Sequence, residues 1–176
     1  MNRYWISSDG TFNNTINWSE SSGGPSGATI PDSTDIAIFD SNSGSCTIDA
    51  TTSALQFNLG YDYTSTVFYT NPVYLKNLTL AGGYLTTSNE SSMFISGDAS
   101  CLSSFGSFSP SNNANLVIDG SGIQYISVGG IYPNVMIDKT TTNQVIFIGD
   151  VPYYGYGELV INDGTLNTNG HDIILR

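Results

Sequence analysis

Four aspartates in the C-terminal half of the chain have a residue type and spacing that could do chemistry. Each follows a short apolar run: Asp119, Asp138, Asp150 and Asp163. If those runs are strands stacked about 4.8 Å apart, successive carboxylates lie about 5 Å apart, which suits general acid and base catalysis on sugars. Two exposed charges at that distance repel by only about 0.8 kcal/mol in water, so the column can form without a ligand.

Turn formation explains the same pattern more simply, because aspartate is a common turn residue at the end of a strand. We therefore assign no catalytic residue and expect a chain that is not an enzyme. A calcium ion bridging two of the four carboxylates is a weaker alternative. No other metal and no cofactor is predicted.

Tyrosines form a second group that could hold a ligand. Three of them lie on a loop with glycines and two form a smaller pair: Tyr153, Tyr154 and Tyr156, then Tyr61 and Tyr63. Tyrosine faces stack on sugar rings, and tyrosine also anchors protein interfaces at low entropic cost. We take these five as candidate glycan-binding residues, with subunit packing and simple local packing as the alternatives.

Short strands must position all of these residues. Apolar runs of three or four residues recur, and Gly, Asn or Asp ends most of them, so none is long enough for a helical stripe. The runs lie at 116–118, 135–137, 145–148, 159–161 and 173–175. The starts at 116, 135 and 159 are separated by 19 and then 24 residues, which fits the irregular coil of a β-solenoid.

The same runs separate a solenoid from a β-sandwich or jelly roll. Asp119-Gly120 and Asp163-Gly164 would suit the tight hairpins of a sandwich. Runs such as Leu116-Val117-Ile118 have no polar face, however, and therefore favour parallel strands whose outer side is partly covered. We predict an all-β parallel β-helix, with the sandwich or jelly roll as the alternative.

The N-terminal segment differs from the rest of the chain and predicts a cap. Trp5, Phe12 and Trp18 lie close together in sequence and must pack over something, most simply over the open end of the solenoid. We therefore divide the chain into a capping module, residues 1–45, and a solenoid body, residues 46–176.

Alternation within the body predicts which side chains point inward. Leu55, Phe57 and Leu59 should face one side of a strand, and Gln56 and Asn58 the other. At the other end, the chain stops soon after the last apolar run. Its edge should be covered by another subunit or by further sequence.

Composition excludes several classes of partner. Fifteen acids against four bases give a net charge of −11, so the chain should repel nucleic acid and anionic lipid surfaces. No segment approaches the roughly 20 apolar residues of a membrane span. The N-terminus lacks the apolar core of a signal peptide. Cys46 and Cys101 favour buried free thiols over a disulfide, because two cysteines make no framework.

About the first 50 residues resemble a known module. The resemblance is carried by Arg3-Tyr4-Trp5, Gly10-Thr11-Phe12, Asn17-Trp18-Ser19, Ser22-Gly23-Gly24, Gly27-Ala28, Ile30-Pro31, Asp35, Phe39-Asp40 and Cys46 to Ala50. This series is similar to a module of bacteriophage tail and other virion-associated proteins, and to the start of some large bacterial surface proteins with β-solenoid bodies. Phe12 stands where the module more often has tryptophan. The resemblance implies a structural role and supplies no catalytic residue.

We therefore expect a non-enzymatic structural protein of a bacteriophage virion, either a tail-fibre segment or a capsid decoration, located outside the cell. Its expected partners are other virion proteins, further copies of itself in a homo-oligomer such as a trimer, and host surface glycans. A glycan-binding adhesin module on a bacterial cell surface is the second hypothesis. A polysaccharide depolymerase resembling tailspikes is the third.

Overall fold

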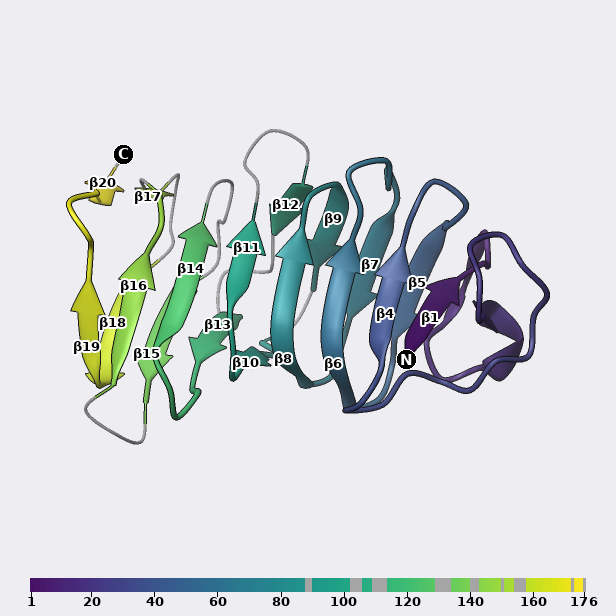
Figure 1. The fold of residues 1–176 in the computed structure, drawn as a ribbon, viewed down its shortest axis with the longest axis horizontal. Coiled ribbons are helices and arrows are strands. Elements are labelled where there is room, and N and C mark those ends of the chain that lie inside the picture. The colour runs from purple at the N-terminus through teal and green to yellow at the C-terminus, as the bar shows by residue number, and fades with distance from the viewer. Residues whose placement is uncertain are drawn as a thin grey trace.

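The chain folds as a parallel β-solenoid, elongated along one axis, with the first strands toward one end and the last described strands at the other (Figure 1). The computed structural model describes residues 1–87, 90–101, 106–108, 114–128, 134–139, 143–149, 151–153, 158–171 and 173–175. Among these residues there is no α-helix, and the one helical turn is a 3-10 turn, Thr15–Asn17. The predicted fold class is confirmed, and the sandwich alternative is wrong because the coils pair in parallel rather than as hairpins. None of the described segments is a helix long and apolar enough to cross a bilayer.

The strands form two main sheets and a short pair. The larger sheet contains β1 (Asn2–Trp5), β3 (Trp18–Ser19), β4 (Ile36–Phe39), β6 (Thr52–Leu59), β8 (Val73–Leu80), β10 (Met93–Ile95), β11 (Ala99–Cys101), β13 (Asn115–Ile118), β14 (Gln124–Val128), β15 (Asn134–Asp138), β16 (Gln144–Phe147), β18 (Leu159–Asp163) and β19 (Thr165–Asn167). The opposite sheet contains β2 (Asp9–Thr11), β5 (Ser45–Ile48), β7 (Thr66–Tyr69), β9 (Gly83–Thr86) and β12 (Gly106–Phe108). A third sheet pairs β17 (Val151–Tyr153) with β20 (Ile173–Leu175).

Strand pairing repeats at the spacing that the apolar runs predict. Leu116 pairs with Val135 and Val135 with Leu159, so the runs in β13, β15 and β18 occupy equivalent positions on successive coils. Leu116, Val117 and Ile118 are all buried, with exposures of 0%, 5% and 0%, which explains why this run has no polar residue. The register is regular between β13 and β15, and it shifts by one residue between Ile137 and Asp138 where β15 pairs with β18.

A bend divides the larger sheet, and at this bend the alternation of inward and outward side chains along a strand shifts by one residue. In β8 the inward residues are Val73, Leu75, Leu78 and Leu80, so two outward positions lie next to each other at residues 76 and 77. The same bend passes through β6. The prediction that Leu55 faces the core is therefore wrong: Leu55 is only half-buried, whereas Phe57 and Leu59 are buried as predicted.

In the next coil the bend becomes a corner that interrupts the strand. β10 pairs with the first half of β8 and β11 with its second half, and three residues, Ser96 to Asp98, connect them. Glycine is required at the centre, because a Cβ atom on Gly97 would collide with the Asn77 side chain and the Lys76 carbonyl. Gly120 stands at the next corner, where a Cβ would collide with the Ser96 carbonyl.

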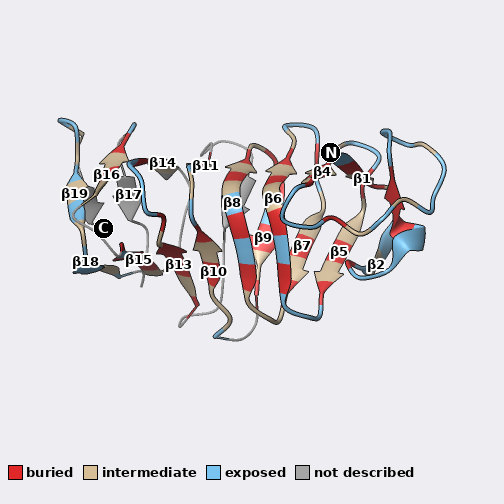
Figure 2. Cartoon of the chain, turned by 60° about the horizontal axis from the view of Figure 1, so that its bottom comes forward, coloured by how far each residue is buried: buried red, intermediate tan, exposed pale blue. Residues whose placement is uncertain are grey.

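Aromatic side chains fill the N-terminal end of the interior. Trp5, Phe12, Trp18, Phe39 and Phe57 are each 0% exposed. The Trp18 ring meets the rings of Trp5 and Phe12 edge-on, with centroids 5.2 and 4.9 Å apart, and Phe12 lies 5.7 Å from Phe57 of the coils. Figure 2 shows buried and exposed residues alternating along the strands. The aromatic residues therefore pack over the core as expected.

The predicted boundary between cap and body at residue 45 stays a prediction. β1 pairs in parallel with β4, and β2 with β5, so strands from the first 45 residues already belong to the two sheets. Residues 12–35 leave the coil path between β2 and β4. We call residues 12–35 the excursion; it contributes the buried rings of Phe12 and Trp18.

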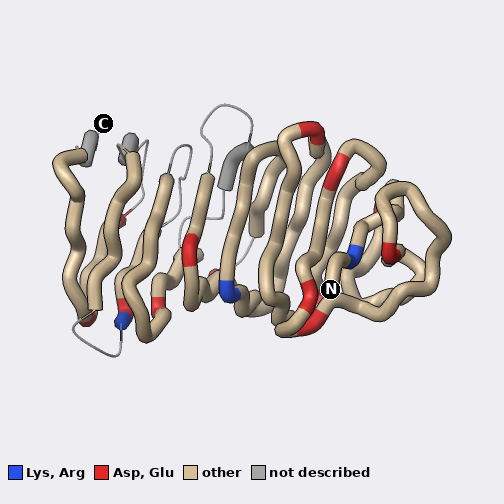
Figure 3. The backbone as a smooth tube through the Cα atoms, viewed as in Figure 1, with Lys and Arg blue, Asp and Glu red and all other residues tan. Residues whose placement is uncertain are grey.

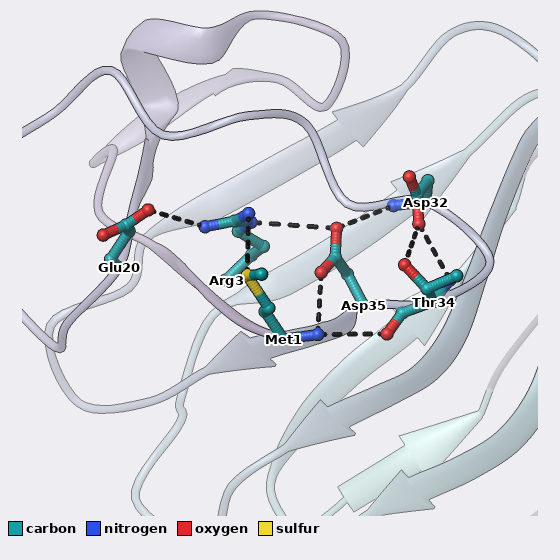
Figure 4. Close-up of polar contacts among 6 residues, drawn as sticks. All are labelled: Met1, Arg3, Glu20, Asp32, Thr34 and Asp35. Carbon is teal, nitrogen blue, oxygen red and sulfur yellow. Dashed lines mark hydrogen bonds and ion pairs between the residues drawn. The ribbon is translucent and has the colours of Figure 1, made fainter.

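A charged cluster fastens the excursion to β1 (Figure 4). Arg3 is 7% exposed, and its Nη1 lies 3.1 Å from Oε1 of Glu20 on the excursion. Asp35, at the end of the excursion, lies 2.8 Å from the amino group of Met1 and 3.7 Å from Nε of Arg3. The Asp35 carbonyl also accepts a hydrogen bond from the N–H of Leu55 at 2.9 Å. These contacts connect the excursion to two coils of the body.

The C-terminal coil is less covered than the rest. Ile161 in β18 is 48% exposed, and Leu159 and Leu166 are half-buried. Among the described strands, β18 pairs with β15 and β19 with β16, which places both at the edge of the sheet.

Cys46 and Cys101 are buried free thiols, as predicted.

Candidate functional site

The aspartates of the predicted column follow successive coils of one sheet. Asp119 comes directly after Ile118, which pairs with Ile137 immediately before Asp138, and Asp138 pairs with Asp163 across a local irregularity. The structure thus brings three of the four together at the end of β13, β15 and β18. Asp150 lies outside the described residues.

Asp119 differs from its neighbours in environment. Its Oδ1 atom is buried and has no hydrogen-bond partner in the described part of the chain, whereas Asp138 and Asp163 are exposed. Burial raises the pKa of the Asp119 carboxyl, and the nearby charge of Asp138 raises it further, although the cation of Lys139 opposes this. A desolvated carboxyl of this kind is the part of the column closest to what acid catalysis needs.

Lys139 lies inside the corner above Asp119, a position that sequence reasoning missed. Its side chain is 0% exposed, and its Nζ donates a hydrogen bond to Oε1 of Gln124. Gln124 in turn donates from Nε2 to the carbonyls of Ile95, at 2.9 Å, and Gly97. Burial lowers the pKa of Lys139. The Gln124 amide thus satisfies backbone groups of Ile95, Gly97 and Gly120 at the corner, and the Lys139 amine bonds the oxygen of that amide, which is a structural role.

The described residues contain no group of three or more His, Cys, Asp or Glu side chains that could hold a metal ion. Calcium at the aspartate column therefore stays the weaker alternative, and it would have to be held by two carboxylates with backbone or water oxygens.

The five candidate tyrosines have different positions. Tyr63 is 1% exposed, packs 5.6 Å from the ring of Phe39 and donates a hydrogen bond from its hydroxyl to the Gly44 carbonyl at 3.1 Å. That core position leaves no ring face for a sugar. Tyr61 is 63% exposed at a turn and stays a candidate. Tyr153 lies in β17, where the structure describes only the backbone, and Tyr154 and Tyr156 lie outside the described residues.

The structure brings together a different set of aromatic residues on the outside of the larger sheet. Tyr74 pairs with Phe94 on the next coil, and their rings stack at 4.8 Å with planes 12° apart. A hollow of about 230 Å³ lies beside this stack. Its lining includes Ser33, Ser53, Tyr74, Lys76, Ser96 and Asp119. The desolvated carboxyl of Asp119 therefore borders a surface that an aromatic pair also borders.

A second hollow, of about 350 Å³, lies on the other side of the bend. Tyr125 and Ile148, 45% and 51% exposed, contribute its apolar part. Its polar lining includes Gln56, Asn77, Thr79, Asp98 and Ser100. The amide of Gln56 donates to the hydroxyl of Thr79 at 3.0 Å, and Asp98 accepts from the Tyr125 N–H at 2.8 Å, so these groups are held in place.

A signal in the sequence could have found these residues. Tyr74 lies between Val73 and Leu75, and Phe94 lies between Met93 and Ile95, which are inward positions at the period of a strand. An aromatic residue between two inward aliphatic residues must face outward. Recognising that both lie on the same outward column requires the 20-residue step between β8 and β10, which only the register supplies.

Charged residues are sparse along the chain, where they make up 11% of the sequence. Figure 3 shows that most of the tube carries neither acids nor bases, and that acids outnumber bases where charge does occur.

A comparison of this chain with protein-family models, with curated proteins and with solved structures finds no match.

Proposed function

We propose that this protein is a non-enzymatic structural component of a bacteriophage virion, a tail-fibre segment or capsid decoration, in which the solenoid is a stiff projecting element. The observation that carries the proposal is the parallel strand pairing that runs from β4 through β18 over a buried hydrophobic interior. A rod of this kind is stiff along its axis, because each coil is held in place by the coils on either side. The resemblance of the first 50 residues to virion-associated modules supports the same role.

The composition of the surface and the exposed edge of the solenoid support the proposal that this protein is part of a larger assembly. Serine, threonine and asparagine rather than lysine carry most of the polarity, and the net charge of −11 disfavours nucleic acid and anionic lipid as partners. In the described part of the chain β18 and β19 are the outermost strands of the larger sheet, and the side chain of Ile161 is exposed there. Such edges are covered by further sequence or by another subunit. For the second case, other virion proteins or further copies of this chain, in a homo-oligomer such as a trimer, are the proposed partners.

Assembly context is the test. Antibodies raised against the purified chain would be used for immunogold labelling of phage particles and of cell envelopes from the producing culture, with mass spectrometry of both fractions. We expect the protein to purify with particles at a fixed stoichiometry. Recovery from the cell envelope alone would contradict the virion assignment and favour a bacterial surface adhesin.

A glycan-binding adhesin is the second candidate, and the two hollows beside Tyr74 and Tyr125 are the observation that favours it. A depolymerase is the third, and Asp119 with its raised pKa next to Asp138 is the observation that keeps it in view. Release of reducing ends from a polysaccharide, abolished in Asp138→Asn or Asp119→Asn, would establish the depolymerase and overturn the non-enzymatic role.

A further inference from the structure

One face of Tyr74 is covered and the other is available. The spacing of 4.8 Å between the Tyr74 and Phe94 rings is close to the spacing of adjacent strands, so the rings stack along the solenoid axis. Phe94 therefore covers the face of Tyr74 that points to the following coil. On the preceding coil, the residue that pairs with Tyr74 is Ser53, which is too small to cover the opposite face. The result is a step in the outer surface with an aromatic wall and a serine floor.

Tyr125 forms a similar step across the bend. Ile126 pairs with Ala99 and Ala99 with Leu78, so the residues just before them, Tyr125, Asp98 and Asn77, follow one another along the outside. Gln56 pairs with Asn77 and extends this column to the next coil. Tyr125 is 45% exposed, as is Tyr74. Each exposed tyrosine is thus followed by polar residues toward the N-terminal end of the rod.

The chemistry of the two hollows matches a sugar. Aromatic faces stack on the C–H face of a pyranose ring, and hydroxyl and amide groups both donate and accept hydrogen bonds, as sugar hydroxyls require. The volume of about 230 Å³ lies below, and that of about 350 Å³ just inside, the roughly 300–1,000 Å³ typical of pockets for drug-sized ligands. Each hollow therefore suits a unit about the size of one sugar ring.

The two hollows are adjacent. Lys76 lines the first and Asn77 the second, and Ser96 and Asp98 are related in the same way on the next coil. One oligosaccharide can therefore cross the bend and place a ring in each hollow. Two weak sites occupied by one chain reinforce each other through effective concentration.

Charge determines which sugars fit. Asp119 borders the first hollow and Asp98 the second, whereas Lys76 is the one base that lines either of them. The chain as a whole carries a net charge of −11. Uronic and sialic acids would therefore meet repulsion at the second hollow and from the net charge of the chain, while uncharged hexoses and N-acetylhexosamines would not.

We propose that the outer surface around the bend, from Tyr74 and Phe94 to Tyr125, is a binding site for a neutral polysaccharide, with one sugar ring stacked on Tyr74 and another on Tyr125. This proposal goes beyond the scaffold role, and it would hold equally for a virion protein and for a surface adhesin.

The test uses the full chain and named polysaccharides. Binding to immobilised dextran, β-galactan and chito-oligosaccharides would be measured beside binding to polysialic acid and alginate, at physiological salt. Tyr74→Ala and Tyr125→Ala are the variants. Tyr84→Ala is the matched control, because Tyr84 is 54% exposed but lies in β9 on the opposite sheet. Circular dichroism confirms that each variant is folded.

We expect at least one neutral polysaccharide to bind the wild type, and Tyr74→Ala and Tyr125→Ala each to weaken that binding at least tenfold, while Tyr84→Ala changes it less than twofold. The proposal is overturned if no neutral polysaccharide binds, if the acidic ones bind more tightly, or if Tyr84→Ala loses as much affinity as the other two. Absence of binding by a protein that still purifies with particles would leave the scaffold role in place.

Discussion

The inner and outer faces of β8 and β10 have opposite characters although they belong to the same strands. Val73, Leu75, Met93 and Ile95 point inward and are 0–3% exposed, whereas Tyr74, between the first two, is 45% exposed. Inward residues are constrained by the stack of coils above and below them. Outward residues are constrained mainly by solubility, so this is where the chain can carry an aromatic pair for another purpose. The period of the strand thus separates stability from recognition residue by residue.

The largest expected effect lies in the interior. Trp18 is 0% exposed between Trp5, Phe12 and Phe39, so Trp18→Ala should lower the free energy of unfolding by about 3–5 kcal/mol through lost burial and a cavity. Ile16→Ala is the control, because Ile16 lies two residues away and is 61% exposed; it should change stability by less than about 0.5 kcal/mol. Urea denaturation measures both. Similar losses in the two variants would contradict the assignment of an inner face.

A middle-sized effect is expected at the corner. Gly97→Ala places a Cβ against the Asn77 side chain and the Lys76 carbonyl, and should cost about 1–3 kcal/mol as the backbone shifts. The matched control is Gly122→Ala, where a Cβ meets no described atom within 4 Å. Thermal unfolding of the two variants compares a crowded with an open glycine. A harmless Gly97→Ala would mean that the coils are less tightly stacked than the corner geometry implies.

The smallest expected effect is the dependence of stability on pH that the buried amine of Lys139 causes. Burial lowers the pKa of Lys139 below its ordinary value of 10.5, so the folded protein binds this proton less tightly than the unfolded chain does. Between the lowered pKa and 10.5 the unfolded state holds more protons, and Lys139 therefore makes the wild type more stable as pH rises through that window. Below the window the buried cation is a constant penalty.

Lys139→Met removes this titration. Gln124 and Asp119 are the groups that face the amine, and Gln124 keeps its bond from the Gly120 N–H in the variant. The variant should be at least as stable as the wild type at neutral pH, because burying a cation is costly. As pH rises toward 10.5, the free energy of unfolding of the wild type should increase relative to that of the variant. Unfolding free energies that run parallel with pH would show that Lys139 is not desolvated.

The sequence was sufficient for the architecture because the architecture depends on repetition. Short apolar runs closed by turn residues predict stacked strands, and the starts at 116, 135 and 159 predict which residues pair. Packing of the tryptophans followed from their size. The prediction for Leu55 was wrong, because β6 bends in the middle and the alternation of inward and outward residues shifts at the bend. The same bend occurs in β8, but the sequence of a single strand does not reveal it.

The candidate site was harder to predict. Tyr61 and Tyr63 look equivalent in sequence, yet Tyr63 is in the core and Tyr61 is exposed on a turn that the Tyr63 N–H closes by donating to the Gly60 carbonyl. Tyr74 and Phe94 are twenty residues apart and meet only through the register of β8 with β10. Such a pair can be recognised from sequence once the step between coils is known, and not before.

One pair of neighbouring substitutions tests the division between inner and outer faces most directly. Leu75→Ala should lower the free energy of unfolding by about 2–5 kcal/mol, because Leu75 is 3% exposed, while the fraction that remains folded keeps its affinity for the neutral polysaccharide. Tyr74→Ala should leave stability within about 1 kcal/mol of the wild type and weaken that affinity at least tenfold. The account is contradicted if Tyr74→Ala unfolds the protein as Leu75→Ala does, or if folded Leu75→Ala loses the affinity that Tyr74→Ala retains.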